Sequence, residues 1–135
     1  FKDIRFPVGK IHEDEFTTYK LIFFSKKCAI IKQQLYIYRI RENSIMTTSI
    51  KRNVDCVRAV RYSIDFYAEQ GNEQLKLKAI YCYLVQCIKW LKYICPKKDR
   101  KEETKFFKRI ARKYAFKLDC SFAKKVYLKF FTIFY

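Results

Sequence analysis

The scarcity of chain-breaking residues constrains the fold of this sequence more than any other feature. Its 135 residues include only two glycines and two prolines. Folds with many tight turns need these residue types at most of their connections. Few breaks leave long uninterrupted segments, and apolar residues spaced three or four positions apart turn such segments into amphipathic helices. The sequence therefore predicts a mostly helical protein.

The chain from residue 49 onward has this helical spacing throughout. We predict four helices, over residues 49–70, 73–94, 102–117 and 120–135. The second has the widest apolar face and is the expected centre of the helical part. It is not expected to span a membrane, because Lys89 and Lys92 interrupt a run that would need about 20 apolar residues.

The first 48 residues have a different pattern. We expect an irregular lead-in over residues 1–12, a helix over 13–26, and short strands at 28–31 and 35–40, where β-branched and aromatic residues gather. The predicted fold class is mostly α with a small β element. We predict two parts, residues 1–48 and a basic amphipathic helical tail over residues 49–135.

Charge and composition limit the class of protein. The chain carries 30 Lys and Arg against 13 Asp and Glu, a net charge of +17. Such a surplus predicts an anionic partner, and nucleic acid, anionic lipid and a phosphorylated substrate remain open. Half of the residues are hydrophobic and 19% are aromatic, which excludes a disordered chain. The six cysteines lie mostly in apolar helical patterns without a CxxC pair, which favours reduced core thiols in a cytoplasmic protein over disulfides or a zinc site.

The first of two motifs lies at residues 6–19 and reads FPVGKIHEDEFTTY. Pro7 has a fixed φ and Gly9 permits a positive φ, so a turn is predicted before the helix. The acids at 13–15 would then occupy the first helical turn. Free N–H groups and the helix dipole favour carboxylates there, so the residue types alone favour simple charge complementarity.

The second motif lies at residues 35–46 and reads LYIYRIRENSIM. With the first motif, in this order and at this spacing, it resembles the C-terminal part of the catalytic domain of bacterial family-2 glycosyltransferases of the inverting GT-A type. The resemblance covers about residues 1–50. Beyond residue 50 it is general, because such enzymes often carry a helical tail. The fold it implies for residues 1–48 is the acceptor-side remnant of a GT-A α/β domain.

The resemblance implies roles for the acidic motif. Asp14 matches the catalytic base, which takes a proton from the acceptor hydroxyl. Glu13 would orient the acceptor or support Asp14. Neighbouring helical residues point about 100° apart, so only one of the two can face a given substrate atom. His12 is a candidate for lining the same site, although a lone histidine more often packs or hydrogen-bonds.

The resemblance also implies a diphosphate-binding role for Arg39, Arg41 and Ser44. Cations stabilise the charge that develops on a nucleoside diphosphate leaving group. Arg39 and Arg41 lie two positions apart, on the same side of a predicted extended segment. The alternative, which stays open, is that the arginines form structural ion pairs with nearby acids (Glu13, Glu15 or Glu42).

One departure from the family is that the sequence contains no Asp-x-Asp element. Family members use this element to hold a divalent cation, Mg²⁺ or Mn²⁺, on the donor diphosphate. We expect the cation and the donor-binding half in a parent enzyme, and no metal site in this chain. Because the chain opens at Phe1 within the pattern, we interpret it as a fragment or truncated product that is inactive alone.

By the resemblance, the parent enzyme transfers a sugar from a nucleotide-sugar to a sugar or lipid-linked acceptor, in cell-surface polysaccharide or glycolipid synthesis. An anionic membrane at the inner face of the cell is a candidate partner, especially for residues 102–135. The alternative function is a basic helical nucleic-acid-binding module, supported by charge and interleaved aromatics. It leaves residues 6–46 unexplained, so nucleic acid is not the expected partner.

Overall fold

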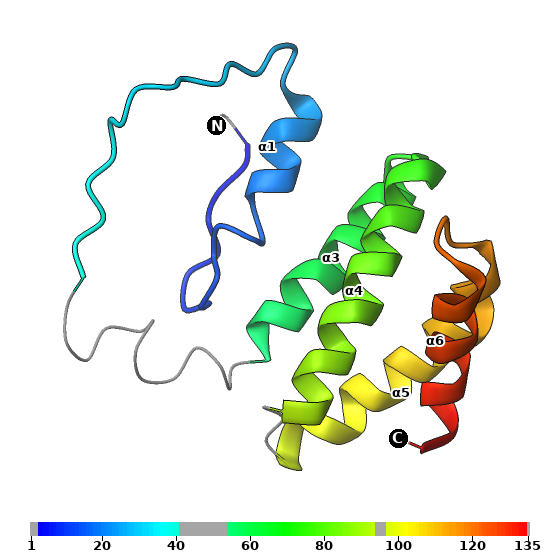
Figure 1. Cartoon of the computed structure of the whole chain (residues 1–135). Helices are drawn as coiled ribbons and strands as arrows, with labels where there is room; N and C mark the ends of the chain where they lie inside the picture. Colours follow the sequence, from blue (N-terminus) through cyan, green and yellow to red (C-terminus); the bar gives the residue numbers. More distant parts are fainter. Residues whose placement is uncertain (1–2, 41–53, 94–96, 135) are drawn as a thin grey trace.

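The computed structural model describes residues 3–40, 54–93 and 97–134 (Figure 1). Its elements are α1 (Thr18–Phe24), α3 (Asp55–Glu69), α4 (Glu73–Tyr93), α5 (Lys97–Tyr114), the short 3₁₀ helix η2 (Ala115–Lys117) and α6 (Phe122–Phe134). We call residues 3–40 the N-terminal arm, and residues 54–93 with 97–134 the helical part. The mostly helical class is confirmed, and within the described ranges no residue lies in a strand.

A tight turn joins α3 to α4, as the sequence predicts. Gly71 adopts a φ of 65°, a backbone conformation that disfavours side chains other than hydrogen. The Asn72 side chain then accepts a hydrogen bond of 3.0 Å from the Leu75 N–H group. This bond satisfies one of the free donors at the start of α4. Glu73 in the first turn forms an ion pair of 2.7 Å with Lys76. Local chemistry thus ends one helix and begins the next.

Helix α4 is the centre of the core, which confirms the prediction from its wide apolar face. Ile80, Tyr83, Leu84 and Cys87 are fully buried in it. Helices α3 and α5 pack against α4, and α6 packs against α5 and η2. Figure 1 shows α3 and α4 running side by side, with α5 and α6 on the other side of α4. Helix α5 begins at Lys97, before the predicted residue 102, because Asp99 suits the positive end of a helix.

A buried carboxylate connects three of these helices. Glu103 of α5 is 0% exposed. Its oxygens accept hydrogen bonds from Arg58 Nε at 3.3 Å, Arg61 Nη1 at 3.2 Å and the Tyr83 hydroxyl at 3.2 Å. Burial also raises the pKa of Tyr83, which keeps its hydroxyl a donor. A carboxylate with three donors is tolerated in the core, because its charge is paired and its lone pairs are used.

The N-terminal arm contacts the helical part through aromatic side chains of α1. Tyr19 and Phe23 each lie 5.3 Å from the Phe66 ring of α3, both edge to face. Phe16, just before α1, lies 5.5 Å from Tyr62. Edge-to-face pairs of this kind contribute about 0.5–1.5 kcal/mol each beyond their area burial. These contacts dock α1 on α3, on the side away from α5 and α6 (Figure 1).

The two predicted strands are wrong, because residues 25–40 lie in an exposed extended segment without a partner among the described residues. Ile30 is 95% exposed and Ile37 is 92% exposed. Apolar β-formers alone do not make a strand, because a strand also needs a neighbour for its backbone hydrogen bonds. The small β element is therefore not seen, and the GT-A remnant and the division at residue 48 remain predictions.

The cysteines within the described ranges are free thiols. Cys87 is buried in the core, as predicted, whereas Cys28 and Cys82 are exposed. Cys95 lies outside the described residues. No described helix is both long and apolar enough to cross a bilayer.

Candidate functional site

The acidic motif forms a turn that precedes α1. The carbonyl of Asp14 accepts hydrogen bonds from the N–H groups of Thr17 at 3.0 Å and Thr18 at 2.8 Å. The Thr17 hydroxyl donates to the Glu13 carbonyl at 3.0 Å. Helix α1 begins only at Thr18, and its first turn contains no acid. The predicted helix start at residue 13 is therefore wrong, because these turn hydrogen bonds hold the acids just outside the helix.

Asp55, the first residue of α3, anchors the segment that leads into this turn. Its Oδ2 atom accepts a hydrogen bond of 3.3 Å from the Ile11 N–H group. Its Oδ1 atom lies 3.5 Å from the Lys10 ammonium. Asp55 is 8% exposed, so these bonds are partly shielded from water. The acidic turn is thus fixed against the N-terminal end of α3.

Asp14 and Glu13 both face solvent from this turn. The Asp14 Oδ1 atom accepts a hydrogen bond of 2.9 Å from the Glu15 N–H group. That bond orients the Asp14 side chain, which is exposed to solvent. A carboxylate in this position is able to accept a proton from a hydroxyl group that approaches from solvent.

Glu15 is a carboxylate that the sequence prediction did not single out. Its Oε1 atom lies 3.7 Å from His12 Nδ1. Burial raises the pKa of Glu15, the nearby His12 lowers it, and the charge of Asp14 raises it. The net direction is upward, which makes Glu15 a stronger proton acceptor than an ordinary glutamate. The sequence shows Glu15 as the third acid of the motif. Its partial burial against α3 could not be predicted, because that burial depends on tertiary packing.

His12 has an unusual backbone conformation in this turn. Its φ is 65°, in the left-handed region that residues other than glycine seldom occupy. Its Nε2 atom is buried and has no hydrogen-bond partner among the described residues. Strained residues of this kind cluster at binding and active sites. The structure therefore places His12 beside Glu15, within the predicted acidic site.

Of the three predicted diphosphate-binding residues, the structure describes only Arg39. Arg39 lies in the exposed extended segment. Within the described ranges, no ion pair connects it to Glu13 or Glu15. Arg41 and Ser44 lie outside the described residues. Their roles therefore remain predictions.

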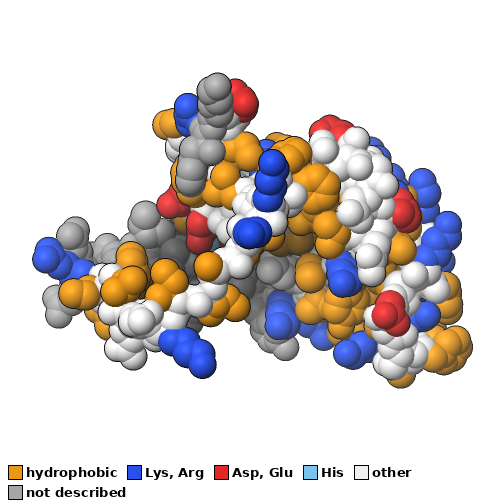
Figure 2. All heavy atoms as spheres, turned by 90° about the horizontal axis from the view of Figure 1, so that it is seen from above, with side chains coloured by type: hydrophobic (Ala, Val, Ile, Leu, Met, Phe, Trp, Pro, Cys, Tyr) orange, Lys and Arg blue, Asp and Glu red, His pale blue; other side chains and the backbone are white. Residues whose placement is uncertain are grey.

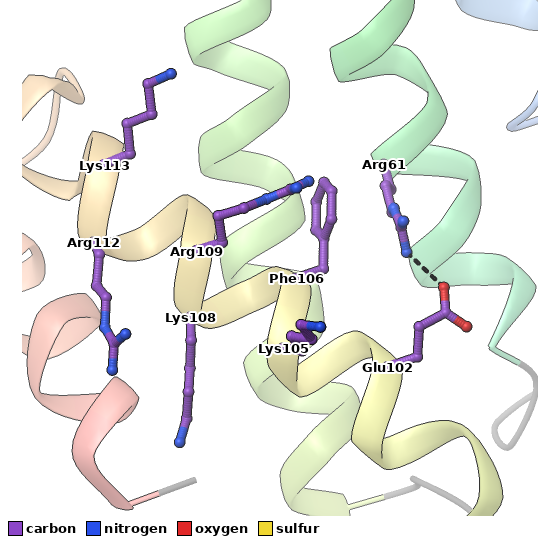
Figure 3. A pocket seen from close by; sticks show the side chains of 8 residues that line it. All are labelled: Arg61, Glu102, Lys105, Phe106, Lys108, Arg109, Arg112 and Lys113. Carbon is purple, nitrogen blue, oxygen red and sulfur yellow. Dashed lines mark hydrogen bonds and ion pairs between the residues drawn. The ribbon is translucent and has the colours of Figure 1, made fainter.

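A second candidate site is a cationic groove beside α3 and α5, which encloses about 700 Å³. Its residues are mostly basic (Arg61, Glu102, Lys105, Phe106, Lys108, Arg109, Arg112 and Lys113). The Arg61 and Arg109 guanidinium carbons lie 3.9 and 4.7 Å from the centre of the Phe106 ring. Figure 3 shows Arg61 reaching from α3 toward Glu102, and Arg109 lying across toward Phe106.

Most of the cations in this groove are not neutralised. Arg61 pairs with Glu102 at 3.0 Å and with Glu103 at 3.2 Å. Among the described residues, no ion pair joins the other five cations to a carboxylate. Cation–π contacts with Phe106 hold the guanidinium groups in place without removing their charge. The groove therefore attracts anions. The positive charge of these residues was visible in the sequence, but the position of the groove was not.

Comparison with known proteins gives one line of functional evidence. The chain is 29% identical over 87 residues to the glycosyltransferase GlyA of Streptococcus pneumoniae serotype 4. The aligned segment makes up 64% of this chain but only 12% of that much longer protein. No family model matches the chain, and no solved structure matches it. The likeness supports a relationship to glycosyltransferases, without indicating family 2 or the GT-A type.

Proposed function

We propose that this chain is the acceptor-side part of an inverting, family-2-like glycosyltransferase. The parent enzyme would transfer a sugar from a nucleotide-sugar to a hydroxyl group of a sugar or lipid-linked acceptor, in cell-surface polysaccharide or glycolipid synthesis. The observation that carries the proposal is the 87-residue likeness to a glycosyltransferase. The two motifs at residues 6–19 and 35–46 support the family assignment. We place the activity in the cytoplasm.

In this proposal the acidic turn activates the acceptor. Asp14 accepts the hydroxyl proton while the acceptor oxygen forms a bond to the anomeric carbon. The bond from that carbon to the nucleoside diphosphate breaks, and the leaving group takes the electron pair. Glu13 orients the acceptor, and His12 lines the site. Arg39, Arg41 and Ser44 are the proposed contacts of the diphosphate.

The divalent cation of such enzymes does not fit this chain. The sequence has no Asp-x-Asp element. Among the described residues, no three His, Cys, Asp or Glu side chains come together in a way that would hold a metal ion. We therefore assign the Mg²⁺ or Mn²⁺ site and the donor-binding half to another part of the parent enzyme. On this view the isolated chain does not turn over a nucleotide-sugar.

The test uses an enzyme in which this chain is joined to its donor-binding half. We expect Asp14→Asn to lower turnover by about 10²-fold or more, because the acceptor loses its base. The matched variant Glu15→Gln should lower it by less than about threefold, because Glu15 only borders the site in this scheme. Release of nucleoside diphosphate measures turnover, and thermal unfolding verifies that both variants are folded.

The reverse ranking would contradict the role of Asp14 and identify Glu15 as the base. The pH profile distinguishes the two cases independently. Because burial raises the pKa of Glu15 above the ordinary 4.5, a Glu15 base would lose activity at a higher pH on acidification than an ordinary carboxylate. Near-normal turnover of both variants would refute a catalytic acidic turn altogether.

The cationic groove favours a second candidate function, nucleic acid binding. Five cations in its lining have no carboxylate partner among the described residues, and such cations attract the phosphates of a nucleic acid backbone. A mobility-shift assay with single-stranded DNA and RNA at several salt concentrations tests it. A steep loss of affinity with salt, removed by Arg109→Glu, would support this function. Binding that is unchanged in the variant would exclude the groove as the site.

A further inference from the structure

The outer face of α6 is apolar where a surface helix is normally polar. Phe122, Phe130 and Ile133 are 74%, 55% and 70% exposed. With the half-buried Val126 they recur at intervals of four, four and three residues, which places them in one stripe along the helix. All four side chains of the stripe are hydrocarbon. We call these residues the α6 stripe.

The packing of α6 does not require this stripe. The opposite side of the helix is buried through Leu128, Phe131 and Thr132. Phe131 lies 5.4 Å from Phe107 of α5, edge to face. The helix therefore already contributes one apolar face to the core, and the α6 stripe is a second one. A helix that is apolar on two sides exposes more hydrocarbon than folding explains.

The stripe continues beyond the helix. Phe116 of η2 is 53% exposed. Its ring centre lies 6.5 Å from that of Phe122. The exposed apolar surface therefore runs from η2 along the full outer side of α6. Figure 2 shows hydrophobic side chains between basic ones along the outer edge of the helical part.

Two lysines, Lys125 and Lys129, border the stripe along one side. Lys129 donates a hydrogen bond of 2.8 Å to the Arg112 carbonyl, and Lys125 lies 3.4 Å from the Phe116 carbonyl. Lys124, one turn before the buried Leu128, lies on the side of α6 that faces α4, 3.5 Å from the Tyr81 hydroxyl. These neutral acceptors position the ammonium groups without cancelling their charge. Among the described residues, no ion pair with a carboxylate includes Lys124, Lys125 or Lys129.

A separate groove lies between α4 and α6, on the Lys124 side of the helix. It encloses about 450 Å³. Apolar side chains of Val85, Ile88 and Leu128 and three lysines, Lys89, Lys92 and Lys124, share its walls. An apolar groove with ammonium groups at its edge suits a ligand with a hydrocarbon part and a phosphate part, as a phospholipid has.

We propose that the α6 stripe, with Phe116, docks the protein on the surface of an anionic bilayer. The apolar side chains enter the boundary between headgroups and acyl chains, and the flanking lysines contact lipid phosphates. A second copy of the chain is a poorer occupant, because a two-fold interface would bring the same lysine borders together in a chain of net charge +17. The inference rests on this surface and not on the proposed transferase activity.

Vesicle co-sedimentation of the whole chain tests the proposal. We expect binding to phosphatidylcholine vesicles that contain about a quarter phosphatidylglycerol, and at least tenfold weaker binding to phosphatidylcholine alone. The double variant Phe130→Ser/Ile133→Ser should weaken binding to the anionic vesicles by about tenfold or more, because both side chains would leave the membrane boundary. Both residues are exposed, so the variant should keep the helical circular dichroism spectrum.

The matched control is Ile30→Ser/Ile37→Ser, which removes two even more exposed apolar side chains from the N-terminal arm. It should bind vesicles as the parent chain does. Equal binding by the α6 variant, or an equal loss in the control, would overturn the proposal. So would a dimer in analytical ultracentrifugation that the α6 variant abolishes, because the stripe would then be a contact between copies.

A lysine variant separates insertion from simple charge attraction. Lys125→Ala/Lys129→Ala should weaken binding to anionic vesicles by about fivefold per lysine while sparing the weak binding to neutral ones. In high salt, the residual binding should still depend on Phe130 and Ile133. Binding that disappears in salt for the parent chain and the α6 variant alike would refute insertion of the stripe.

Discussion

The N-terminal arm and the helical part contain similar apolar side chains but bury them to very different extents. Leu84 of α4 is fully buried, whereas Leu35 of the arm is 78% exposed. The same contrast separates Ile80, which is buried, from Ile37, which is 92% exposed. A helix satisfies its own backbone hydrogen bonds and presents its apolar face to neighbours. An extended segment obtains neither benefit without a partner strand, so apolar composition alone does not create a core.

The largest expected effect is the difference in stability between alanine variants of Leu84 and Leu35. Leu84→Ala should reduce the free energy of unfolding by about 3 kcal/mol, because it removes buried methyl groups and leaves a cavity. Leu35→Ala should change it by less than about 0.5 kcal/mol, because the side chain is already in water. Chemical denaturation followed by circular dichroism measures both. Similar losses in the two variants would show that residues 25–40 pack in solution.

A smaller effect is expected from two adjacent glutamates in α5. Glu103→Gln should cost about 2 kcal/mol, because a buried acceptor of bonds from Arg58 and Arg61 loses its charge. Glu102→Gln should cost less than about 1 kcal/mol, because the Glu102 side chain is 59% exposed. Thermal unfolding at neutral pH compares them. A larger loss for Glu102 would contradict the buried network.

The contribution of Glu102 to the free energy of unfolding changes with pH in a definite direction. The Arg61 hydrogen bond, then the Arg58 charge, lowers the pKa of Glu102 below its ordinary 4.5. The folded state thus prefers the charged form. The stabilisation is complete above pH 4.5 and is lost as the pH falls through the lowered pKa. The difference in stability between the parent chain and Glu102→Gln should therefore shrink on acidification.

The smallest effect concerns the contact between the two regions. Phe66→Ala removes the ring against which Tyr19 and Phe23 pack. It should cost less than about 1.5 kcal/mol globally, yet it should release α1 from α3. Hydrogen exchange should rise at the amides of residues 10–24 and stay slow in α4. Phe122→Ala, on α6, is the control and should leave the arm unchanged. Faster exchange throughout α4 would mean that Phe66 supports the core.

Sequence reasoning performed best where structure follows from neighbours along the chain. The apolar spacing of α4 identified the central helix. The Gly71 and Asn72 pair identified the turn before it, because a positive φ and a side-chain cap are local properties. The helical spacing of α6 was also visible. It could not show, however, which of the two apolar sides would face the core.

Sequence reasoning failed where structure depends on distant partners. The strand prediction at Ile37 required a neighbouring strand, and none is present in the described residues. The helix start at residue 13 required the acids to cap a helix, but turn hydrogen bonds keep them outside it. The burial of Glu103 depends on Arg58, Arg61 and Tyr83, which come from two other helices. The helical spacing places Glu103 one turn before the buried Phe107, but it does not reveal the three donors that make burial of a carboxylate possible.

The candidate site shows the same difference between local and distant determinants of structure. The motif identified Asp14, Glu13 and His12 as neighbours, and the structure places them in one turn against α3. It could not reveal that Glu15 would be partly buried beside His12, because the shielding surface comes from the start of α3. The proposed diphosphate contacts stay predictions, since Arg39 is exposed and Arg41 and Ser44 are not described.

The buried Glu103 also fixes how far α5 can slide along its neighbours. If α5 moved by one turn so that Phe107 took the place of Glu103, Arg58 and Arg61 would lose their acceptor. A one-turn move in the other direction would put Glu103 where Phe107 now lies, a carboxylate among hydrocarbon. One buried acid therefore helps to select the axial register of α5 against α3 and α4.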